Sequence, residues 1–155
     1  FQYPTERQVS RLARACYKRL DALGNDQLVH ELASAPNEIA KQINLYAVMR
    51  YNRLVWEFMI QVIGEKYRNQ DMIFSRKDMN AFFSRLQAQD DSVAAWSDAT
   101  ITKIKSVLVR MLIETGYLDG LKDTTLNPVF LCEELERGIE ANNDCDALPA
   151  FNYFR

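Results

Sequence analysis

The residues of this chain best suited to binding a ligand are positively charged residues at helical spacing. The strongest set follows intervals of four, three and four residues near the N-terminus: Arg7, Arg11, Arg14 and Lys18. This spacing places all four on one face of a helix expected over residues 5–23. Such a face attracts an anion, and a phosphate backbone would neutralise it with release of counterions. The alternatives are a solvated face, or a helix that pairs with the acidic C-terminal region.

A second set lies on the outward face of a helix expected over residues 98–115. Its members are Lys103, Ser106 and Arg110. Helices expected over 75–89 and 92–96 precede it, and a small β-hairpin or wing is expected near 117–127. A recognition helix in a helix-turn-helix or winged-helix unit has this setting and meets base edges in the major groove. An ordinary helical subdomain with exposed Lys and Arg is an equal alternative.

The sequence contains no cluster of residues typical of a catalytic site. His30 is the single histidine, and the three cysteines are widely spaced without a CxxC pair. No P-loop, GxGxxG or GxSxG motif is present. A divalent-metal site among the acidic residues of 133–146 is much less favoured than a solvated face. We therefore expect no enzyme activity, no cofactor, no metal site and no disulfide framework, in a reducing cytoplasm.

Composition and spacing predict an all-α, compact multi-helix protein. The chain has 155 residues, 48% of them hydrophobic, with only five Gly and four Pro. Further helices are expected over 26–35, 37–68 and 129–139, and a break of the long one near Tyr51-Asn52 is the alternative to a continuous helix. A polar break at 69–71 suggests two parts: an N-terminal helical subdomain, 1–69, and a helix-turn-helix-like subdomain with an acidic tail, 70–155.

Charge is unevenly distributed along the chain. Residues 1–122 hold 17 Lys and Arg against 14 Asp and Glu, whereas residues 123–155 hold 2 against 7. The densest apolar stretch, 54–63, is too short and too polar to span a bilayer, so no membrane association is expected. The aromatic end (Phe151, Tyr153 and Phe154) is expected to dock on the body or on a partner.

The run WSDATITKIKSVLVRMLIETGYLDG, preceded by AFFSRLQAQDDSVAAW, resembles the BrxA family of BREX bacteriophage-exclusion systems. INLYAVMRYNRLVWEFMIQVIGEKY fits as well, and the resemblance extends from about Pro4 to Ile139. It implies an all-helical cytoplasmic protein that acts beside a methyltransferase, an ATPase and other BREX subunits. The family has been likened to the RNA-binding factor NusB, is regarded as DNA-binding and is not known as an enzyme. The resemblance also implies further residues before Phe1.

These observations converge on one functional hypothesis and one alternative. The hypothesis is a non-catalytic BREX component that binds nucleic acid, duplex DNA being favoured over RNA, through both sets of residues. Phosphate contacts carry little sequence information, so weak sequence preference is expected. The slightly acidic net charge of −2 argues against strong nonspecific binding. The alternative is a protein-interaction adaptor that scaffolds a defence complex without touching nucleic acid.

Overall fold

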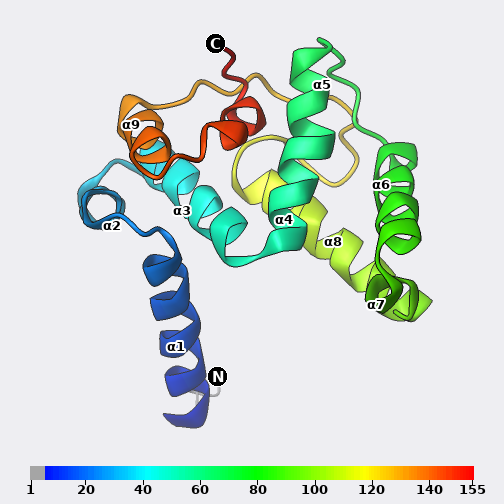
Figure 1. Cartoon of the computed structure of the whole chain (residues 1–155), viewed down its shortest axis with the longest axis horizontal. Helices are drawn as coiled ribbons and strands as arrows, with labels where there is room; N and C mark the ends of the chain where they lie inside the picture. The colour runs from blue at the N-terminus through cyan, green and yellow to red at the C-terminus, as the bar shows by residue number, and fades with distance from the viewer. Residues whose placement is uncertain (1–5) are drawn as a thin grey trace. The chain divides into compact units, whose positions relative to one another are not determined.

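The described part of the chain is helical, as predicted. The computed structural model describes residues 6–155, apart from the side chains at positions 6, 8, 9 and 12. Within that range the helices are α1 (Glu6–Ala22), α2 (Asp26–Ser34), α3 (Asn37–Tyr51), α4 (Arg53–Phe58), α5 (Glu65–Arg68), α6 (Arg76–Gln89), α7 (Asp91–Ala94), α8 (Asp98–Glu114) and α9 (Glu133–Ala141) (Figure 1). A π-helix, η1 (Met59–Gly64), joins α4 to α5, and a 3₁₀ helix, η2 (Cys145–Phe151), follows α9. The sequence offers Thr5 as a side-chain cap for the start of α1, and this residue lies outside the described residues.

The chain divides into two compact units that are not contiguous in sequence. The first unit contains the described residues up to Trp56 together with Cys132–Cys145. The second contains Glu57–Leu131 and Asp146–Arg155. This division differs from the boundary expected at 69–70, because Phe58 packs in the second unit edge-to-face against Phe74 and Phe82.

The core of the first unit forms where α2 and α3 pack against α9. Leu28, Ile43, Leu135 and Ile139 are buried there. Helix α9 approaches α2 closely at Gly138, where a Cβ atom would lie only 2.5 Å from Cδ1 of Leu28. The absence of a side chain at Gly138 therefore permits this contact.

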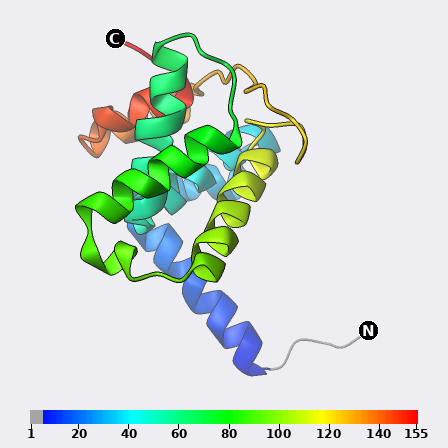
Figure 2. The same ribbon diagram turned by 90° about the vertical axis from the view of Figure 1, so that its right-hand side faces the viewer.

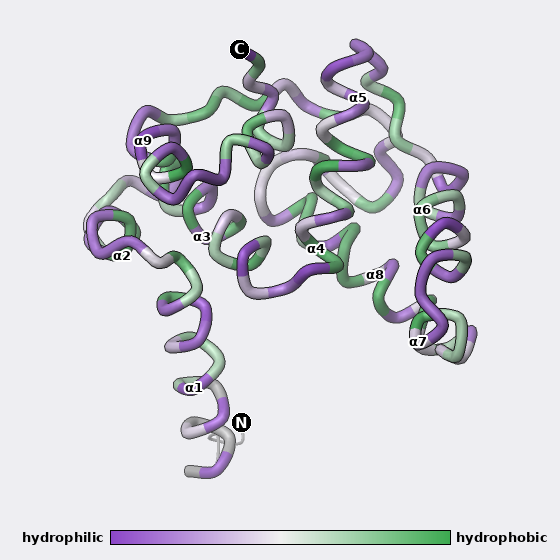
Figure 3. Tube along the Cα trace, in the orientation of Figure 1, coloured by the Kyte–Doolittle hydropathy of each residue, from purple (hydrophilic) through white to green (hydrophobic). Residues whose placement is uncertain are grey.

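The core of the second unit is rich in aromatic side chains. The rings of Phe58 and Phe82 meet edge-to-face with centroids 5.4 Å apart, and Phe82 meets Phe83 in the same way at 5.5 Å. Such edge-to-face pairs add stabilisation beyond that of buried area. The hydroxyl of Tyr117 donates to the carbonyl of Ala150 at 2.8 Å, which ties η2 to the end of α8. Figure 3 shows hydrophobic residues concentrated along α4 and η1, the part that carries Phe58 into this core.

The break expected near Tyr51-Asn52 is confirmed, and residues close in sequence also cap two later helices. The long helical stretch breaks at Asn52, whose side chain accepts from the backbone N–H groups of the next helix. Ser75 and Asp78 form a capping box at the start of α6. Ser97 caps α8 by accepting from the N–H of Thr100 at 3.2 Å. The last α-helix, by contrast, begins at Glu133 rather than at residue 129.

The expectation of a β-hairpin near 117–127 is wrong. Within the described residues, the one isolated β-bridge joins Thr125 to Ile73 in antiparallel fashion. The N–H of Phe74 donates to Thr124, and the N–H of Leu126 donates to Met72, both at 2.7 Å. The extended segment therefore pairs with residues that precede α6, and its own two ends are joined by one backbone hydrogen bond, from the N–H of Asn127 to the carbonyl of Tyr117 at 2.8 Å.

Candidate nucleic-acid interface

Helix α1 presents the four predicted cations to solvent. Arg7, Arg11, Arg14 and Lys18 are all exposed. Within the part of the chain that the structure describes, none of the four forms an ion pair with a carboxylate. The local pairing that would make this face an ordinary salt-bridged surface is therefore not found among the described side chains.

Helix α1 meets the rest of the first unit through its C-terminal end. Figures 1 and 2 show its N-terminal part extending away from α2, α3 and α9. Between positions 7 and 19 the described side chains are exposed except that of Ala15, which is half-buried, whereas Leu23 is fully buried. The basic face is thus carried on a helix that is fixed at one end.

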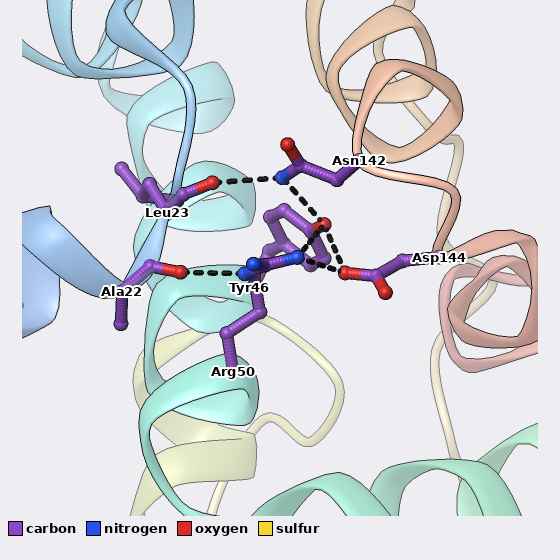
Figure 4. Close-up of polar contacts among 6 residues, drawn as sticks. All are labelled: Ala22, Leu23, Tyr46, Arg50, Asn142 and Asp144. Atoms are coloured by element: carbon purple, nitrogen blue, oxygen red, sulfur yellow. Dashed lines mark hydrogen bonds and ion pairs between the residues drawn. The ribbon is translucent and has the colours of Figure 1, made fainter.

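A polar network holds that end in place (Figure 4). The guanidinium of Arg50 donates to the carbonyl of Ala22 and pairs with the carboxylate of Asp144. The side-chain amide of Asn142 donates to the carbonyl of Leu23 at 2.7 Å and to the hydroxyl of Tyr46 at 3.0 Å. A cation and an amide thus satisfy carbonyls that the end of α1 leaves without helical partners.

Tyr46 is the buried centre of this network. Its hydroxyl donates to Asp144 Oδ2 at 2.6 Å. Burial, reinforced by the carboxylate of Asp144, raises the pKa of Tyr46 to about 12. The phenol therefore stays protonated and keeps donating at neutral pH.

The second predicted set lies on α8. Lys103, Ser106 and Arg110 are exposed. The hydroxyl of Ser106 donates to the carbonyl of Thr102 at 3.1 Å. Toward a ligand this hydroxyl therefore acts as an acceptor. Lys103 and Arg110 form no ion pair with the carboxylates that the structure describes.

A groove in the second unit adjoins this face of α8. Its volume is about 880 Å³, and it lies among the start of α6, the face of α8 and the loop that follows α8. Ser106 and Arg110 line it and Lys103 does not. Three further cations line it that the sequence did not single out: Arg76, Lys105 and Lys122. Their common location depends on the fold, because they come from three separate segments.

The seven predicted residues thus form two sets, one in each unit. The structure brings the four α1 residues together on one surface and the three α8 residues together on another. In the described residues, no group of three or more His, Cys, Asp and Glu side chains is placed to hold a metal ion. Nor is any described helix long and apolar enough to cross a membrane.

The geometry defines a class before any comparison: an all-helical protein that displays cationic surfaces. The comparisons place it more closely. The BrxA family model matches residues 1–143, and the chain belongs to the BrxA family.

Curated relatives agree with this assignment. The chain is 38% identical over 122 residues to the BREX protein BrxA of Bacillus cereus, a match that covers 79% of this chain and 60% of that protein. It is 24% identical over 126 residues to the BREX protein BrxA of Paramagnetospirillum magneticum, with 81% and 63% covered. The matched part therefore spans somewhat less than two thirds of these relatives.

A solved structure shares the fold. The crystal structure of an uncharacterized protein from Magnetospirillum magneticum superposes with a TM-score of 0.80 at 20% identity. The superposition covers 96% of this chain and 85% of that one. The helical arrangement is thus found in an experimentally determined structure.

Proposed function

We propose that this chain is a non-catalytic, nucleic-acid-binding component of a BREX bacteriophage-defence system, acting in the cytoplasm on duplex DNA. Its relatives are named as BREX proteins, which supports both a role in a BREX system and other BREX subunits as partners. The observation that carries the DNA-binding role is the exposed face of α1, with four cations and no ion pair among the described side chains. Placing phosphates there releases counterions without breaking existing salt bridges.

Helix α8 supplies the second contact of the proposal. Lys103 and Arg110 offer charge, and Ser106 offers a hydroxyl acceptor between them. Contacts to phosphates position a protein without reading sequence, so the proposal includes weak sequence preference.

A fluorescence-anisotropy titration with a labelled duplex of about 30 base pairs, at about 50 and 200 mM salt, tests the proposal. The unmodified protein is expected to bind at low salt and to lose affinity steeply as salt rises. Arg11→Glu/Arg14→Glu is expected to weaken binding about tenfold or more and to reduce the slope of log K against log salt by about two.

The matched control reverses two cations that already have partners in the same unit. Lys41 pairs with Glu38, and Arg137 with Glu133. Lys41→Glu/Arg137→Glu changes the net charge equally and is expected to alter binding much less. If the two variants lost equal affinity for the duplex, the loss would be explained by the change in net charge alone, and the α1 site would be refuted.

The adaptor alternative loses part of its support. It assigns the docking of another subunit to the acidic tail and the aromatic end, but Phe151 is fully buried within the second unit. Phe154 remains 45% exposed, with the guanidinium of Arg68 over its ring. Failure of the unmodified protein to bind any duplex or single strand at low salt would favour the adaptor role.

A further inference from the structure

The groove in the second unit combines an apolar floor with a charged rim. Phe74, Met79 and Leu118 line it as buried residues, and Val109 is half-buried. Leu121 is 80% exposed at its edge. An exposed leucine beside an apolar floor favours a ligand that brings aliphatic side chains.

The rim is strongly unbalanced in charge. The described lining residues include four cations (Arg76, Lys105, Arg110 and Lys122) and one carboxylate, that of Asp123. Lys105 is held in place, since its ammonium donates to Asn80 Oδ1 at 2.8 Å and lies 5.5 Å from the centre of the Phe83 ring. Arg76 and Lys122 form no ion pair with any described carboxylate. The complementary ligand is therefore anionic.

The shape and lining disfavour nucleic acid as the occupant. The deoxyribose-phosphate surface of a duplex is mainly polar and carries no aliphatic side chain that could fill the floor. Unstacked bases are usually held on exposed aromatic rings, whereas the one aromatic residue of this groove, Phe74, is only 5% exposed. A peptide with aliphatic side chains flanked by carboxylates matches both the floor and the rim.

We propose that this groove is a docking site for an acidic peptide segment of a partner protein, with aliphatic side chains on the floor and carboxylates on Arg76 and Lys122. This site is separate from the basic face of α1. It shares Ser106 and Arg110 with the α8 contact proposed for DNA, so the face of α1 would hold DNA while a duplex and the partner's peptide compete at α8.

The test uses a labelled peptide of about 12 residues in which Glu pairs alternate with Leu pairs, titrated against the whole chain. A second peptide of equal length replaces every Leu with Ser and keeps the charge. The first peptide is expected to bind at least about tenfold more tightly than the second, because only the first fills the floor. In ¹⁵N NMR spectra, the amide shifts are expected to concentrate at residues 74–80 and 105–124.

Two variants locate the site without touching the residues assigned to DNA. Arg76→Glu/Lys122→Glu is expected to weaken the Leu-containing peptide about tenfold and to leave the duplex titration within about twofold. Leu121→Asp, at an exposed position that tolerates the change, is expected to weaken that peptide by a similar factor. The control is Lys77→Glu/Arg85→Glu, two exposed positions on α6 outside the groove.

Each outcome decides the proposal. Equal affinity for the two peptides, or equal loss in the control variant, would show attraction to general positive charge and overturn it. Loss of duplex binding in Arg76→Glu/Lys122→Glu with the peptide unaffected would assign the groove to DNA. Failure of the α1 variant to weaken DNA binding would refute the proposed function and leave the groove intact.

Discussion

A single buried lysine connects two helices in the second unit. Lys66 is only 8% exposed, and its ammonium lies 2.9 Å from Asp71 Oδ2 and 3.1 Å from Asp78 Oδ1. Asp78, the N3 residue of the capping box at the start of α6, also accepts from the N–H of Ser75 at 2.7 Å. One carboxylate therefore both starts a helix and neutralises a buried cation.

This cluster predicts a specific acid sensitivity. Lys66, followed by the N–H of Ile73, lowers the pKa of Asp71. Burial opposes the charge on Asp78, but the Ser75 N–H and Lys66 outweigh it and lower the pKa of Asp78 as well. Because both folded pKa values lie below the unfolded value of 3.8, the stabilisation is present above that pH and is lost as pH falls through the folded values.

Asp78→Asn tests the cluster by urea unfolding between about pH 7 and pH 3. At neutral pH the variant is expected to lose about 1–2 kcal/mol, because a cap and an ion pair are weakened. The gap from the unmodified protein is expected to narrow as pH falls, since protonation of Asp78 removes from the unmodified protein the charge that the variant already lacks. A gap that stays constant would show that Asp78 acts only through packing.

Helices α2 and α9 of the first unit pack closely at Gly138, which has no side chain. Gly138→Ala on its own would favour a helix by about 1 kcal/mol. The added Cβ would nevertheless collide with buried Leu28, so a net loss of about 1–3 kcal/mol is expected.

A double-mutant cycle separates the two effects. Leu28→Ala is expected to cost about 2–5 kcal/mol by itself, through the cavity it leaves. In that background Gly138→Ala is expected to become neutral or stabilising, because the colliding atoms are gone. Additive losses, measured by urea unfolding, would contradict close packing at this point.

Helix α1 depends on the network at its C-terminal end. Asn142→Ala removes the donor to Leu23 and to the Tyr46 hydroxyl, and is expected to cost about 1–2 kcal/mol. Hydrogen exchange is expected to quicken in α1 more than in α3, because the described side chains of α1 between positions 7 and 19 are exposed apart from that of Ala15. Exchange that rises equally in both helices would mean that the network stabilises the unit as a whole.

The local features were predictable because they depend on neighbours in sequence. The cap at Ser97, the capping box at Ser75 and the break at Asn52 each rest on residues within a few positions. The exposure of Arg11 and Arg14 followed from helical periodicity alone. The partner of Thr125 was not predictable, because Ile73 is joined to it only through the intervening fold. The location of Arg76 and Lys122 in one groove was not predictable for the same reason.

At the scale of the whole molecule, the chain leaves the first unit after Trp56, returns at Cys132 and leaves again after Cys145. Helix α9 buries Leu135 and Ile139 in the first unit, and η2 buries Phe151 in the second. The C-terminal residues thus complete both cores, which a linear division of the sequence does not anticipate.

Separate expression of residues 1–69 and 70–155 tests this organisation. Neither fragment contains a whole unit, so neither is expected to unfold cooperatively on heating when followed by circular dichroism. The full chain serves as the control. A sharp transition in either fragment would support the boundary expected from the sequence.

The return of the chain to its first unit has a consequence for its synthesis. At about 5–20 residues per second, the ribosome needs several seconds to a fraction of a minute to make the segment between Trp56 and Cys145. During that interval the apolar faces of α2 and α3 that α9 covers in the folded unit lack this partner. The nascent chain is therefore expected to recruit chaperones at this stage, and slow codons within residues 57–131 would prolong the exposure.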